Sequence, residues 1–504
     1  MNPFPVERIT PLNQAPIHPE AAFVLYWMIA FRRAQWNFSL QRAVDWACEL
    51  GKPLMILEAV SCDYPWAGER LHSFILEGMQ DNGCDFESAP ALYFPFVEES
   101  RGQGKGLVRE LAAMACIVIT DDYPSFFLPQ TVRSVGKNLP TRMEAIDSNG
   151  LLPMAIADRV FQTAYSFRRY LQQQLPRFLD QFPKENPLSG VCLPGLREIP
   201  KEIAMKWPMA DTLITALPDL LRSLPIDHTV KPVAARGGSR AARKRVADFL
   251  HTSLHRYHID RNHPDENATS RLSPYLHFGH ISVHEIFSEL RRVERWSLEK
   301  LSAGASGKRE GWWGMSPGGE AFLDQLVTWR ELGFNICSKR DDYDRFDSLP
   351  GWAIETLCAH ESDSRRYLYA PEDFESAKTH DPLWNAAQRQ LLSEGRLHNY
   401  LRMLWGKKIL EWTSSPRAAL EIMVELNNKY ALDGRDPNSY TGIFWVLGRY
   451  DRPFGPQRAI FGTIRYMSSR SAVKKNQAHR IHALFCSSLI RIPAGAGISF
   501  FETA

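Results

Sequence analysis

At 504 residues, the chain is too long for a single hydrophobic core, and its length predicts two to three domains. Hydrophobic residues make up 44% of it and charged residues 23%, which is ordinary for a soluble globular protein. The net charge of +3 is nearly balanced and gives no indication of a nucleic-acid-binding tail, although 60 Lys and Arg side chains can still gather on one face.

The eight cysteines are scattered and contain no C-x-x-C pair. Structural zinc sites and iron–sulfur clusters need clustered thiolates, so we expect no metal and no iron–sulfur cluster. The sequence has no signal-peptide pattern and no apolar run long enough to span a membrane. We therefore expect a cytoplasmic protein that makes no contact with a membrane, and we expect it to be a monomer.

The first 150 residues alternate between strand and helix patterns. Residues 1–20 are proline-rich and aperiodic, so we expect a loosely ordered start. Apolar runs of strand length follow at 22–28, 54–60, 90–97 and 116–120, and residues 39–50 have helical spacing. This alternation predicts a parallel α/β sheet in a domain over residues 21–155. No G-x-G-x-x-G follows the first strand, which excludes an ordinary dinucleotide-binding domain.

The pattern changes after about residue 155. Residues 156–235 contain many prolines and are interpreted as an interdomain connector. From residue 236 to 504 nearly every element has helical period, which predicts an all-α domain. The expected helices are 243–256, 284–295, 320–338, 382–394, 398–411 and 416–426.

A cluster of small hydroxyl residues precedes one of these helical stretches. Thr269, Ser270 and Ser273 stand just before or at a helix opened by Pro274. Hydroxyl side chains in this position cap free N–H groups, and the same geometry receives phosphate. The residues alone leave both interpretations open.

The surrounding sequence resembles one family. Tyr257 and the run from Arg261 to Pro264 precede Ala268–Gly279, and together they are similar to the pattern with which photolyases and cryptochromes hold the phosphates of FAD. The runs 378–388, 407–412 and 432–438 resemble class II photolyases, which repair cyclobutane pyrimidine dimers. The matches extend from about residue 230 to Met467 in one register and are weaker in the N-terminal domain.

The resemblance implies an α/β N-terminal domain with a Rossmann-like sheet, an all-α FAD-binding domain, and a set of cofactor residues. Arg402 and Asp433 resemble the family's ion pair beside the flavin ring, with a purely structural salt bridge as the alternative. Asn427 resembles the asparagine that faces flavin N5. The full set of residues expected to bind FAD is Tyr257, Thr269, Ser270, Arg271, Leu272, Ser273, Arg402, Asp433 and Asp436.

Three tryptophans are candidates for an electron relay. Trp405 and Trp412 are seven residues apart on one expected helix, so they share a face about 10 Å apart along its axis. Aromatic residues at this spacing more often fill a core. The resemblance favours a relay, because class II photolyases use tryptophans at these places and at Trp384 to photoreduce FAD.

The resemblance also implies a DNA substrate with a flipped-out pyrimidine dimer. The residues expected at the DNA are Asn399, Trp445, Arg452 and Phe454, where Trp445 fits a stacking position and Phe454 replaces a family tryptophan. The family places a glutamate at the position of Gln325. A glutamine amide donates a hydrogen bond but no proton, and Asp324 lies about 100° round the helix.

Two functions therefore stay open from the sequence. One is a light-driven DNA photolyase that splits cyclobutane dimers with an electron from reduced FAD. The other is a cryptochrome-like photoreceptor, favoured by Gln325 and Phe454. A dark redox flavoprotein would need a nicotinamide site, for which there is no motif, and no histidine pair supports repair of six-four photoproducts.

The N-terminal domain has two interpretations as well. In class II relatives this domain holds a deazaflavin antenna, so the resemblance implies the same ligand here. The segment from Tyr26 to Arg33 lacks an acid that the class II pattern has, and apolar residues replace polar ones, which favours a domain that serves only as a scaffold.

Overall fold

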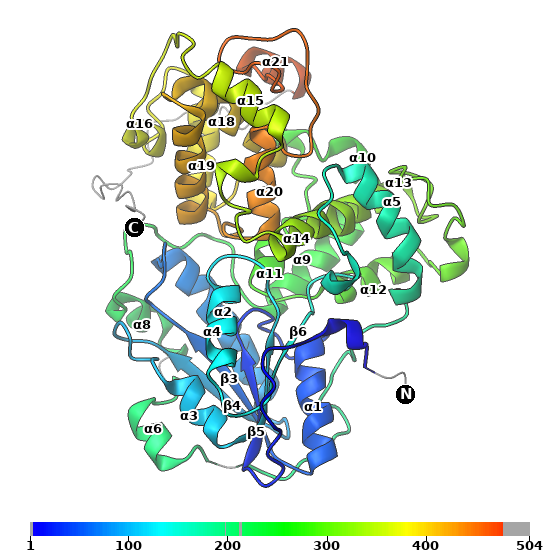
Figure 1. Ribbon diagram of the computed structural model, residues 1–504, viewed down its shortest axis with the longest axis vertical. Helices are drawn as coiled ribbons and strands as arrows, with labels where there is room; N and C mark the ends of the chain where they lie inside the picture. The colour runs from blue at the N-terminus through cyan, green and yellow to red at the C-terminus, as the bar shows by residue number, and fades with distance from the viewer. Residues whose placement is uncertain (1–3, 197, 211–213, 477–504) are drawn as a thin grey trace.

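The computed structural model describes residues 4–196, 198–210 and 214–476. In Figure 1 an α/β region forms the lower half and a helical region the upper half. The two predicted structural classes are confirmed. Within the described ranges, no helix has the length and apolarity needed to cross a membrane.

A six-stranded sheet is the centre of the α/β region. Its strand order is β1-β6-β5-β2-β3-β4, and all neighbours are parallel except β1 and β6. Four predicted strands are confirmed within two residues, whereas β1 and β6 were not predicted from the sequence. The bounds are β1 Ile9–Pro11, β2 Phe23–Met28, β3 Leu54–Val60, β4 Leu92–Val97, β5 Ala115–Asp121 and β6 Met143–Ile146.

Both faces of the sheet are covered, which explains why its strands are continuous apolar runs. Val24, Tyr26 and Met28 of β2 pack in one apolar cluster with α1, and the alternate residues Leu25 and Trp27 pack in another with α3 and α4. The helices of this region are α1 Phe38–Leu50, α2 Glu69–Phe86, α3 Leu107–Ala113 and α4 Leu128–Lys137.

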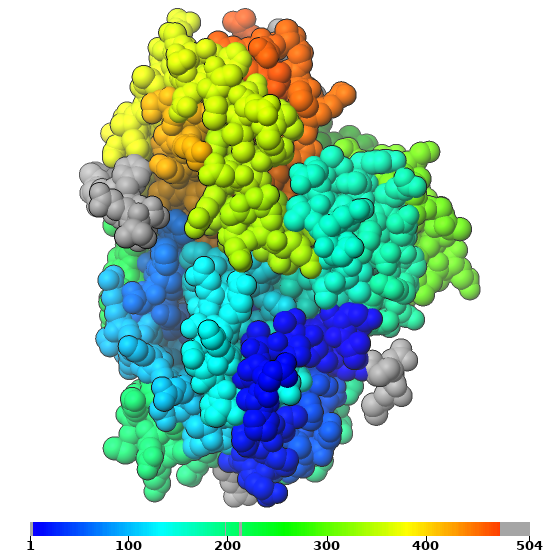
Figure 2. Space-filling model, viewed as in Figure 1, coloured from blue at the N-terminus to red at the C-terminus, as the bar shows by residue number. Residues whose placement is uncertain are grey.

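The expectation of a loosely ordered start is wrong for residues 4–20, and residues 1–3 lie outside the described part. A short helix, η1 (Val6–Arg8), leads into β1, which pairs with the sheet edge. Figure 2 shows this dark-blue segment lying on the surface and reaching the helical region. The Arg8 guanidinium is buried and donates to the carbonyls of Asp147, Gly150 and Leu151 at 3.0–3.2 Å. Because these contacts join residues that are distant in sequence, no local sequence pattern predicts them.

The connector is partly helical and packs onto both regions. It contains α5 (Ala164–Gln174), α6 (Lys201–Lys206) and α8 (Leu217–Ser223). Trp207 is buried against the sheet region and its indole N–H donates to the Gln103 carbonyl at 2.7 Å. Leu171 and Leu220 belong to a core that also contains helical-region residues such as Phe287, so the connector binds the two halves together.

The helical region confirms the predicted helices with two changes. The expected helix 243–256 is α9 (Ser239–Thr252) followed by a short 3-10 helix at Leu254–Arg256. The expected helix 320–338 is three segments, α13 (Pro317–Leu323), a π-helical turn at Asp324–Trp329 and α14 (Arg330–Lys339). Single π-helical turns inside α-helices are rare and gather at functional sites. The other elements are α9 Ser239–Thr252, α10 Tyr257–Asp260, α11 Ser273–His277, α12 Val283–Val293, α15 Gly351–Ala359, α16 Pro371–Glu375, α17 Pro382–Glu394, α18 Asn399–Trp412, α19 Pro416–Tyr430, α20 Pro437–Val446 and α21 Ser469–Asn476. The C-terminal end of the domain proposed for residues 236–504 lies outside the described residues.

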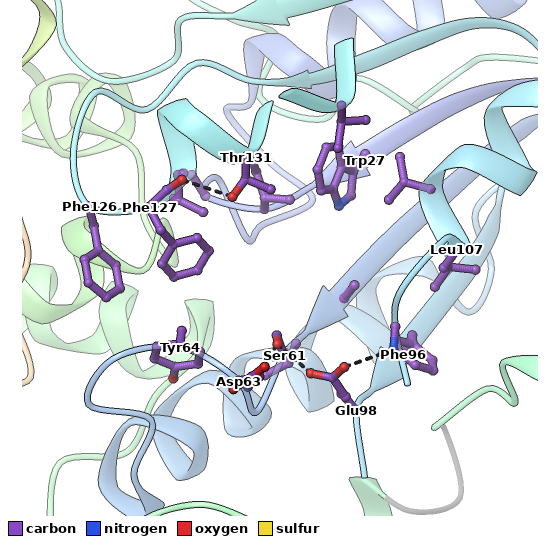
Figure 3. A pocket seen from close by; sticks show the side chains of 18 of the residues that line it. Trp27, Ser61, Asp63, Tyr64, Phe96, Glu98, Leu107, Phe126, Phe127 and Thr131 are labelled. Atoms are coloured by element: carbon purple, nitrogen blue, oxygen red, sulfur yellow. Dashed lines mark hydrogen bonds between the residues drawn. The ribbon is translucent and has the colours of Figure 1, made fainter. Parts of the chain in front are cut away.

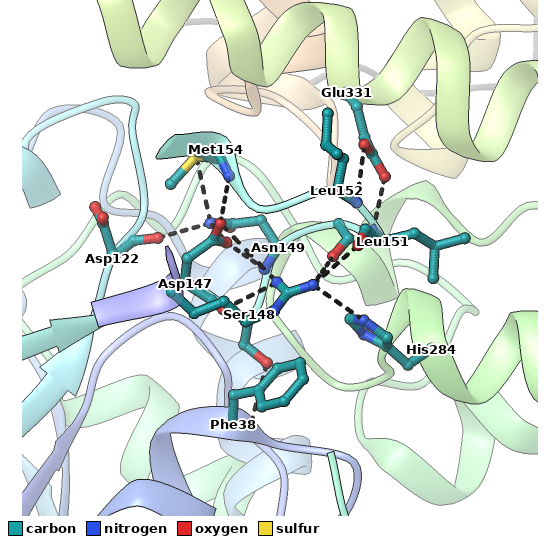
Figure 4. Close-up of polar contacts among 12 residues, drawn as sticks. Phe38, Asp122, Asp147, Ser148, Asn149, Leu151, Leu152, Met154, His284 and Glu331 are labelled. Carbon is teal, nitrogen blue, oxygen red and sulfur yellow. Dashed lines mark hydrogen bonds and ion pairs between the residues drawn. The ribbon is translucent and has the colours of Figure 1, made fainter. Parts of the chain in front are cut away.

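The helix α14 is fixed to the α/β region by buried polar contacts. The carboxylate of Glu331 accepts from the backbone N–H groups of Leu151 at 2.8 Å and Leu152 at 3.4 Å (Figure 4). Arg330 donates to the Asn149 carbonyl at 2.6 Å. Burial raises the pKa of Glu331 to about 8, only partly opposed by the two N–H groups and by Arg330.

This raised pKa predicts a pH-dependent stability. Between about pH 5 and 8 the unfolded chain releases the Glu331 proton while the folded protein retains it, so the free energy of unfolding should fall as the pH rises. One pKa unit corresponds to about 1.4 kcal/mol, so the fall should reach a few kcal/mol. In urea unfolding at pH 5, 6, 7 and 8, Glu331→Gln should flatten the dependence, because the amide still accepts a hydrogen bond but does not titrate. Glu99→Gln, at an exposed carboxyl group, is the control. Equal pH slopes in wild type and Glu331→Gln would contradict this assignment.

Candidate functional site

The hydroxyl cluster at residues 269–273 does not cap its helix. The N-cap residue of α11 is Leu272, and no side chain accepts from the first turn. The hydroxyl groups of Thr269, Ser270 and Ser273 make no hydrogen bond to any residue that the structure describes. The capping interpretation is therefore wrong, and these donors are available to another group. The loop itself is fixed through its carbonyls, since Arg245 donates to Ser270 at 2.8 Å and to Thr269 at 3.1 Å.

Three arginines gather at this loop. Arg271 has a left-handed backbone conformation (φ 56°) and a half-buried side chain whose Nε is enclosed without a protein partner. Burial and the charges of Arg396 and Arg245 together lower the pKa of Arg271 to about 10. Mutual repulsion of this kind is relieved by an anion, and the free hydroxyls lie beside it.

The loop is joined to the helix that carries Gln325. Tyr257 is buried, and its ring packs edge-on against Phe322 with a centroid distance of 5.8 Å. Arg261 donates to the Ala321 carbonyl at 3.2 Å. The expected cofactor residue Leu272 is buried in the same core as Tyr257.

Arg402 and Asp433 form the predicted ion pair. The two oxygens of Asp433 lie 3.2 and 3.4 Å from one guanidinium nitrogen of Arg402, and both side chains are largely buried. Asp433 stands on a tight loop after α19. Gly434 in that loop approaches α19 so closely that an added Cβ would meet the Asn427 carbonyl at 2.7 Å. The loop geometry therefore fixes the position of the carboxylate.

Two more expected site residues, Asn427 and Asp436, make different kinds of contact. Asn427 is buried on α19, and its amide donates to Ser439 at 2.7 Å. The side chain of Asp436 is turned to the domain junction, where one oxygen accepts from Tyr123 at 2.8 Å and the other caps α20 at Asn438. His277 is 3.5 Å from the same carboxylate. Both oxygens of Asp436 are thus used within the protein.

The three candidate relay tryptophans are buried, and Trp384 contacts both of the others. The Trp384 indole N–H donates to the Trp405 carbonyl at 3.0 Å, and the Trp384 and Trp412 rings meet edge-on with centroids 6.0 Å apart. Trp384, on α17, therefore connects the two tryptophans of α18. The ring of Trp412 is followed by the ring of His380 at 4.9 Å.

A stacked tryptophan pair lies next to Gln325. Trp329 and Trp445 are 4.5 Å apart between centroids and nearly parallel, at 16°. Both are partly exposed, and the indole nitrogen of Trp445 is enclosed without a partner. Sequence reasoning missed Trp329. The signal was its spacing, because it stands four residues after Gln325 on the same helical segment.

Gln325 is the free polar group of this segment. Its side chain is partly exposed and makes no hydrogen bond within the described ranges. Asp324 is buried in an ion pair with Arg168 at 2.8 Å, where both side chains are less than a tenth exposed. The carboxylate of Asp324 points to the connector helix α5, so it does not substitute for the family's glutamate.

The remaining expected DNA residues lie on the surface. Asn399 is exposed at the start of α18, and Arg452 is exposed in the loop after α20. Phe454 in that loop lies beneath two cations, with Arg465 at 4.7 Å and Arg452 at 5.8 Å from its ring centroid. In the described part of the chain, no group of three or more His, Cys, Asp or Glu side chains is arranged to hold a metal ion.

A second candidate site is a large cavity in the α/β region. It has a volume of about 1060 Å³ and lies at the carboxyl ends of β2 and β3. Figure 3 shows Tyr64, Phe126 and Phe127 on one side of it and Trp27 and Leu107 on the other. His277 and Arg435 of the helical region complete its wall.

The loop after β2 forms part of this wall. The Asp121 carboxylate accepts from the N–H groups of Ile29, Ala30 and Phe31 at 2.8–2.9 Å. The apolar residues that depart from the class II pattern are thus held in a defined turn, and Ile29 and Ala30 face the cavity.

Known proteins resemble the chain over most of its length. No protein-family model matches it. A deoxyribodipyrimidine photo-lyase of Methanothermobacter thermautotrophicus is 32% identical over 470 residues, covering 93% of this chain and 96% of the relative. A deoxyribodipyrimidine photo-lyase of Potorous tridactylus is 32% identical over 461 residues, covering 90% and 79%.

Solved structures agree with the fold. A class III photolyase from Agrobacterium tumefaciens matches with a TM-score of 0.62 at 16% identity, covering 92% of this chain and 86% of that one. An archaeal photolyase from Sulfolobus tokodaii, solved with two FAD molecules, matches with a TM-score of 0.62 at 14% identity, covering 94% and 92%. At these identities the structures establish the architecture alone. The two long sequence relatives establish more: the chain belongs to the photolyase family.

Proposed function

We propose that the protein binds FAD and uses blue light to split cyclobutane pyrimidine dimers in DNA, as a class II-like photolyase. The observation that carries this proposal is the partly exposed Trp329–Trp445 stack beside the free amide of Gln325. Two parallel indoles at the end of the site offer flat surfaces to the two linked bases of a pyrimidine dimer that has flipped out of the duplex. The family membership of the chain supports the same substrate.

The residues at the candidate flavin site fit FAD. Free hydroxyls and the crowded cations Arg245, Arg271 and Arg396 suit a pyrophosphate, whose charge they would neutralise. The Arg402–Asp433 pair has both signs of charge within a few ångströms, which suits a polar ring edge. When bound, FAD supplies light absorption and one-electron transfer.

Each group of the protein's own residues would then have a separate role in the reaction. Trp405, Trp384 and Trp412 pass electrons inward to restore the reduced cofactor. Trp329 and Trp445 bind the flipped bases, and Asn399, Arg452 and Phe454 contact the opened duplex. Gln325 donates a hydrogen bond to the bound dimer, but its amide does not supply a proton.

The lack of a carboxyl group at Gln325 also supports a second candidate, a blue-light photoreceptor with weak or no repair. Asp324 does not compensate because it is paired with Arg168. The two candidates share the cofactor and the relay and differ only in dimer turnover.

We also propose that the cavity in the α/β region holds an antenna chromophore of the deazaflavin type. Its volume of about 1060 Å³ is sufficient for a tricyclic ring with a side chain. Tyr64, Phe126 and Phe127 offer faces for stacking (Figure 3).

Breaking the Arg402–Asp433 pair should weaken FAD binding. Arg402→Met leaves a largely buried carboxylate unpaired, which costs about 3 kcal/mol or less after solvent screening, or up to about a hundredfold in affinity. The measurement is the flavin absorbance retained after gel filtration and the dissociation constant from fluorescence titration. Arg417→Met, which breaks the exposed pair with Asp347, is the control and should leave binding unchanged. Unchanged flavin affinity in Arg402→Met would remove the pair from the site.

Repair is tested with a thymine-dimer oligonucleotide and photoreduced protein under blue light. We expect restored thymine, and we expect Gln325→Glu to raise the repair rate by about tenfold or more, because a positioned acid contributes roughly 10²–10⁴-fold. Trp329→Ala should weaken dimer binding by about 1–3 kcal/mol through lost stacking. Bound, reducible flavin without any repair would reject the photolyase proposal and favour the photoreceptor.

The antenna proposal is tested by reconstitution. Purified protein mixed with a deazaflavin should retain it through gel filtration and transfer its excitation to the flavin. Thr131→Trp, which adds bulk at the cavity wall, should lower retention about tenfold or more, whereas Gln130→Trp on the exposed side of α4 should not. Equal retention in both variants would place the ligand elsewhere.

A further inference from the structure

Gln388 is a fully buried amide on α17 that contacts the relay directly. Its carbonyl oxygen accepts from the Trp405 indole N–H at 2.8 Å, and its amide nitrogen donates to the Glu375 backbone carbonyl at 3.3 Å. An indole N–H only donates and a carbonyl only accepts, so the two neighbours fix which end of the amide faces Trp405. The acceptor for the Trp405 indole proton is therefore a neutral oxygen.

The second inner tryptophan has the same kind of partner. The Trp384 indole N–H donates to the backbone carbonyl of Trp405, and both rings are almost completely buried. Elsewhere the fold pairs indoles with carboxylates, as in Trp46 with Glu144 at 3.2 Å and Trp66 with Glu425 at 2.8 Å. A charged acceptor is thus compatible with this protein but is not used at the two inner rings.

The choice of acceptor matters because oxidation makes an indole acidic. A tryptophan that has lost one electron is a cation radical whose N–H proton moves to any base within hydrogen-bond distance. The product is a neutral radical, and its reduction back to tryptophan then requires a proton together with the electron. An amide or peptide oxygen is too weak a base to take the proton, so the cation radical keeps it.

We propose that Gln388 is a positioning residue that keeps the indole proton on Trp405 during electron transfer, so that the positive charge moves outward. This inference rests on the proposed flavin photochemistry. Trp405 gives one electron to photoexcited flavin and becomes a cation radical. Trp384 then gives one electron to Trp405, and Trp412 gives one to Trp384, each donor retaining its proton until the charge reaches Trp412.

The proton leaves at the end of this path. Within the described residues the Trp412 indole N–H has no acceptor, unlike those of Trp405 and Trp384. The ring of Trp412 lies against the imidazole of His380, with the Lys408 ammonium 5.4 Å from its centroid. Loss of the indole proton here, to water or to His380, gives a neutral radical, and the electron stays on the flavin.

The experiment compares wild type, Gln388→His and Gln388→Met by transient absorption after a laser flash, using the flavin-loaded protein. The cation and neutral tryptophan radicals have different spectra. In wild type we expect only the cation form until the charge reaches Trp412. In Gln388→His a real base faces Trp405, so the neutral form should appear with the first step.

A second readout is Trp412→Phe in each background. In wild type it should shorten the life of the separated charges by about tenfold or more, because the last donor is lost. In Gln388→His the same substitution should have no further effect, because the charge is already trapped at Trp405. Gln390→His is the matched control, since Gln390 is buried on the same helix and its amide contacts Glu394 and His398 instead of an indole.

Gln388→Met tests the idea if the histidine variant does not fold. This substitution keeps the side-chain length but removes the hydrogen-bond acceptor. The Trp405 indole resonance in the ¹H–¹⁵N spectrum of the flavin-free protein should therefore shift. The first electron step should slow about threefold to tenfold, as expected for loss of one hydrogen bond. The inference is overturned if wild type is photoreduced and Gln388→His keeps the wild-type radical spectra and response to Trp412→Phe. A wild-type rate of the first electron step in Gln388→Met would overturn it as well. A wild type without photoreduction would instead overturn the flavin photochemistry and this inference with it.

Discussion

The position of the candidate site depends on how the helical segment from Pro317 to Lys339 is held at two points. Asp324 is paired with Arg168 of the connector, and Glu331 accepts from the backbone of the α/β region. Both carboxylates are buried, and between them the helix makes its π-helical turn. Because the buried acids fix the rotation of the segment, Gln325 and Trp329 are left on the partly open face toward Trp445. The same two contacts tie the site to both other parts of the chain.

Crowded cations distinguish the loop at residues 269–273 from other buried arginine sites of the protein. Most buried arginines, such as Arg8 and Arg168, are surrounded by carbonyls or carboxylates. Arg271 differs in its neighbours, since the charges of two other arginines, Arg396 and Arg245, act on it. Like charges held together in a partly buried site cost free energy, which a bound anion relieves. Together with the free hydroxyls at residues 269–273, this contrast points to an anionic ligand without reference to any relative.

The sequence predicted the elements that follow from local periodicity and missed those that depend on distant contacts. The β3 strand and helix α17 have the predicted bounds because their apolar residues follow one period. Strand β1 was missed because three residues at a sheet edge carry no pattern, and its stability comes from pairing with β6. The ion pair of Arg402 with Asp433 came from the family resemblance. The role of Asp436 at the domain junction and the stack of Trp329 on Trp445 required the tertiary structure.

Electron transfer and proton transfer make separate demands, and the chain meets them differently. Electron transfer needs closely spaced aromatic rings in a dry core, and Trp405, Trp384 and Trp412 satisfy this. Proton transfer needs a titratable group in contact with the reacting atom. The structure has neutral amides instead, Gln325 at the proposed dimer site and Gln388 in contact with Trp405. At Gln388 the missing base helps, because a retained proton keeps the charge mobile. At Gln325 the same property would slow repair, because the dimer radical anion would have no acid at this position to protonate it. In the proposed function, the relay would therefore gain from a neutral amide, whereas dimer repair would lose a proton donor. This difference separates the photolyase candidate from the photoreceptor candidate.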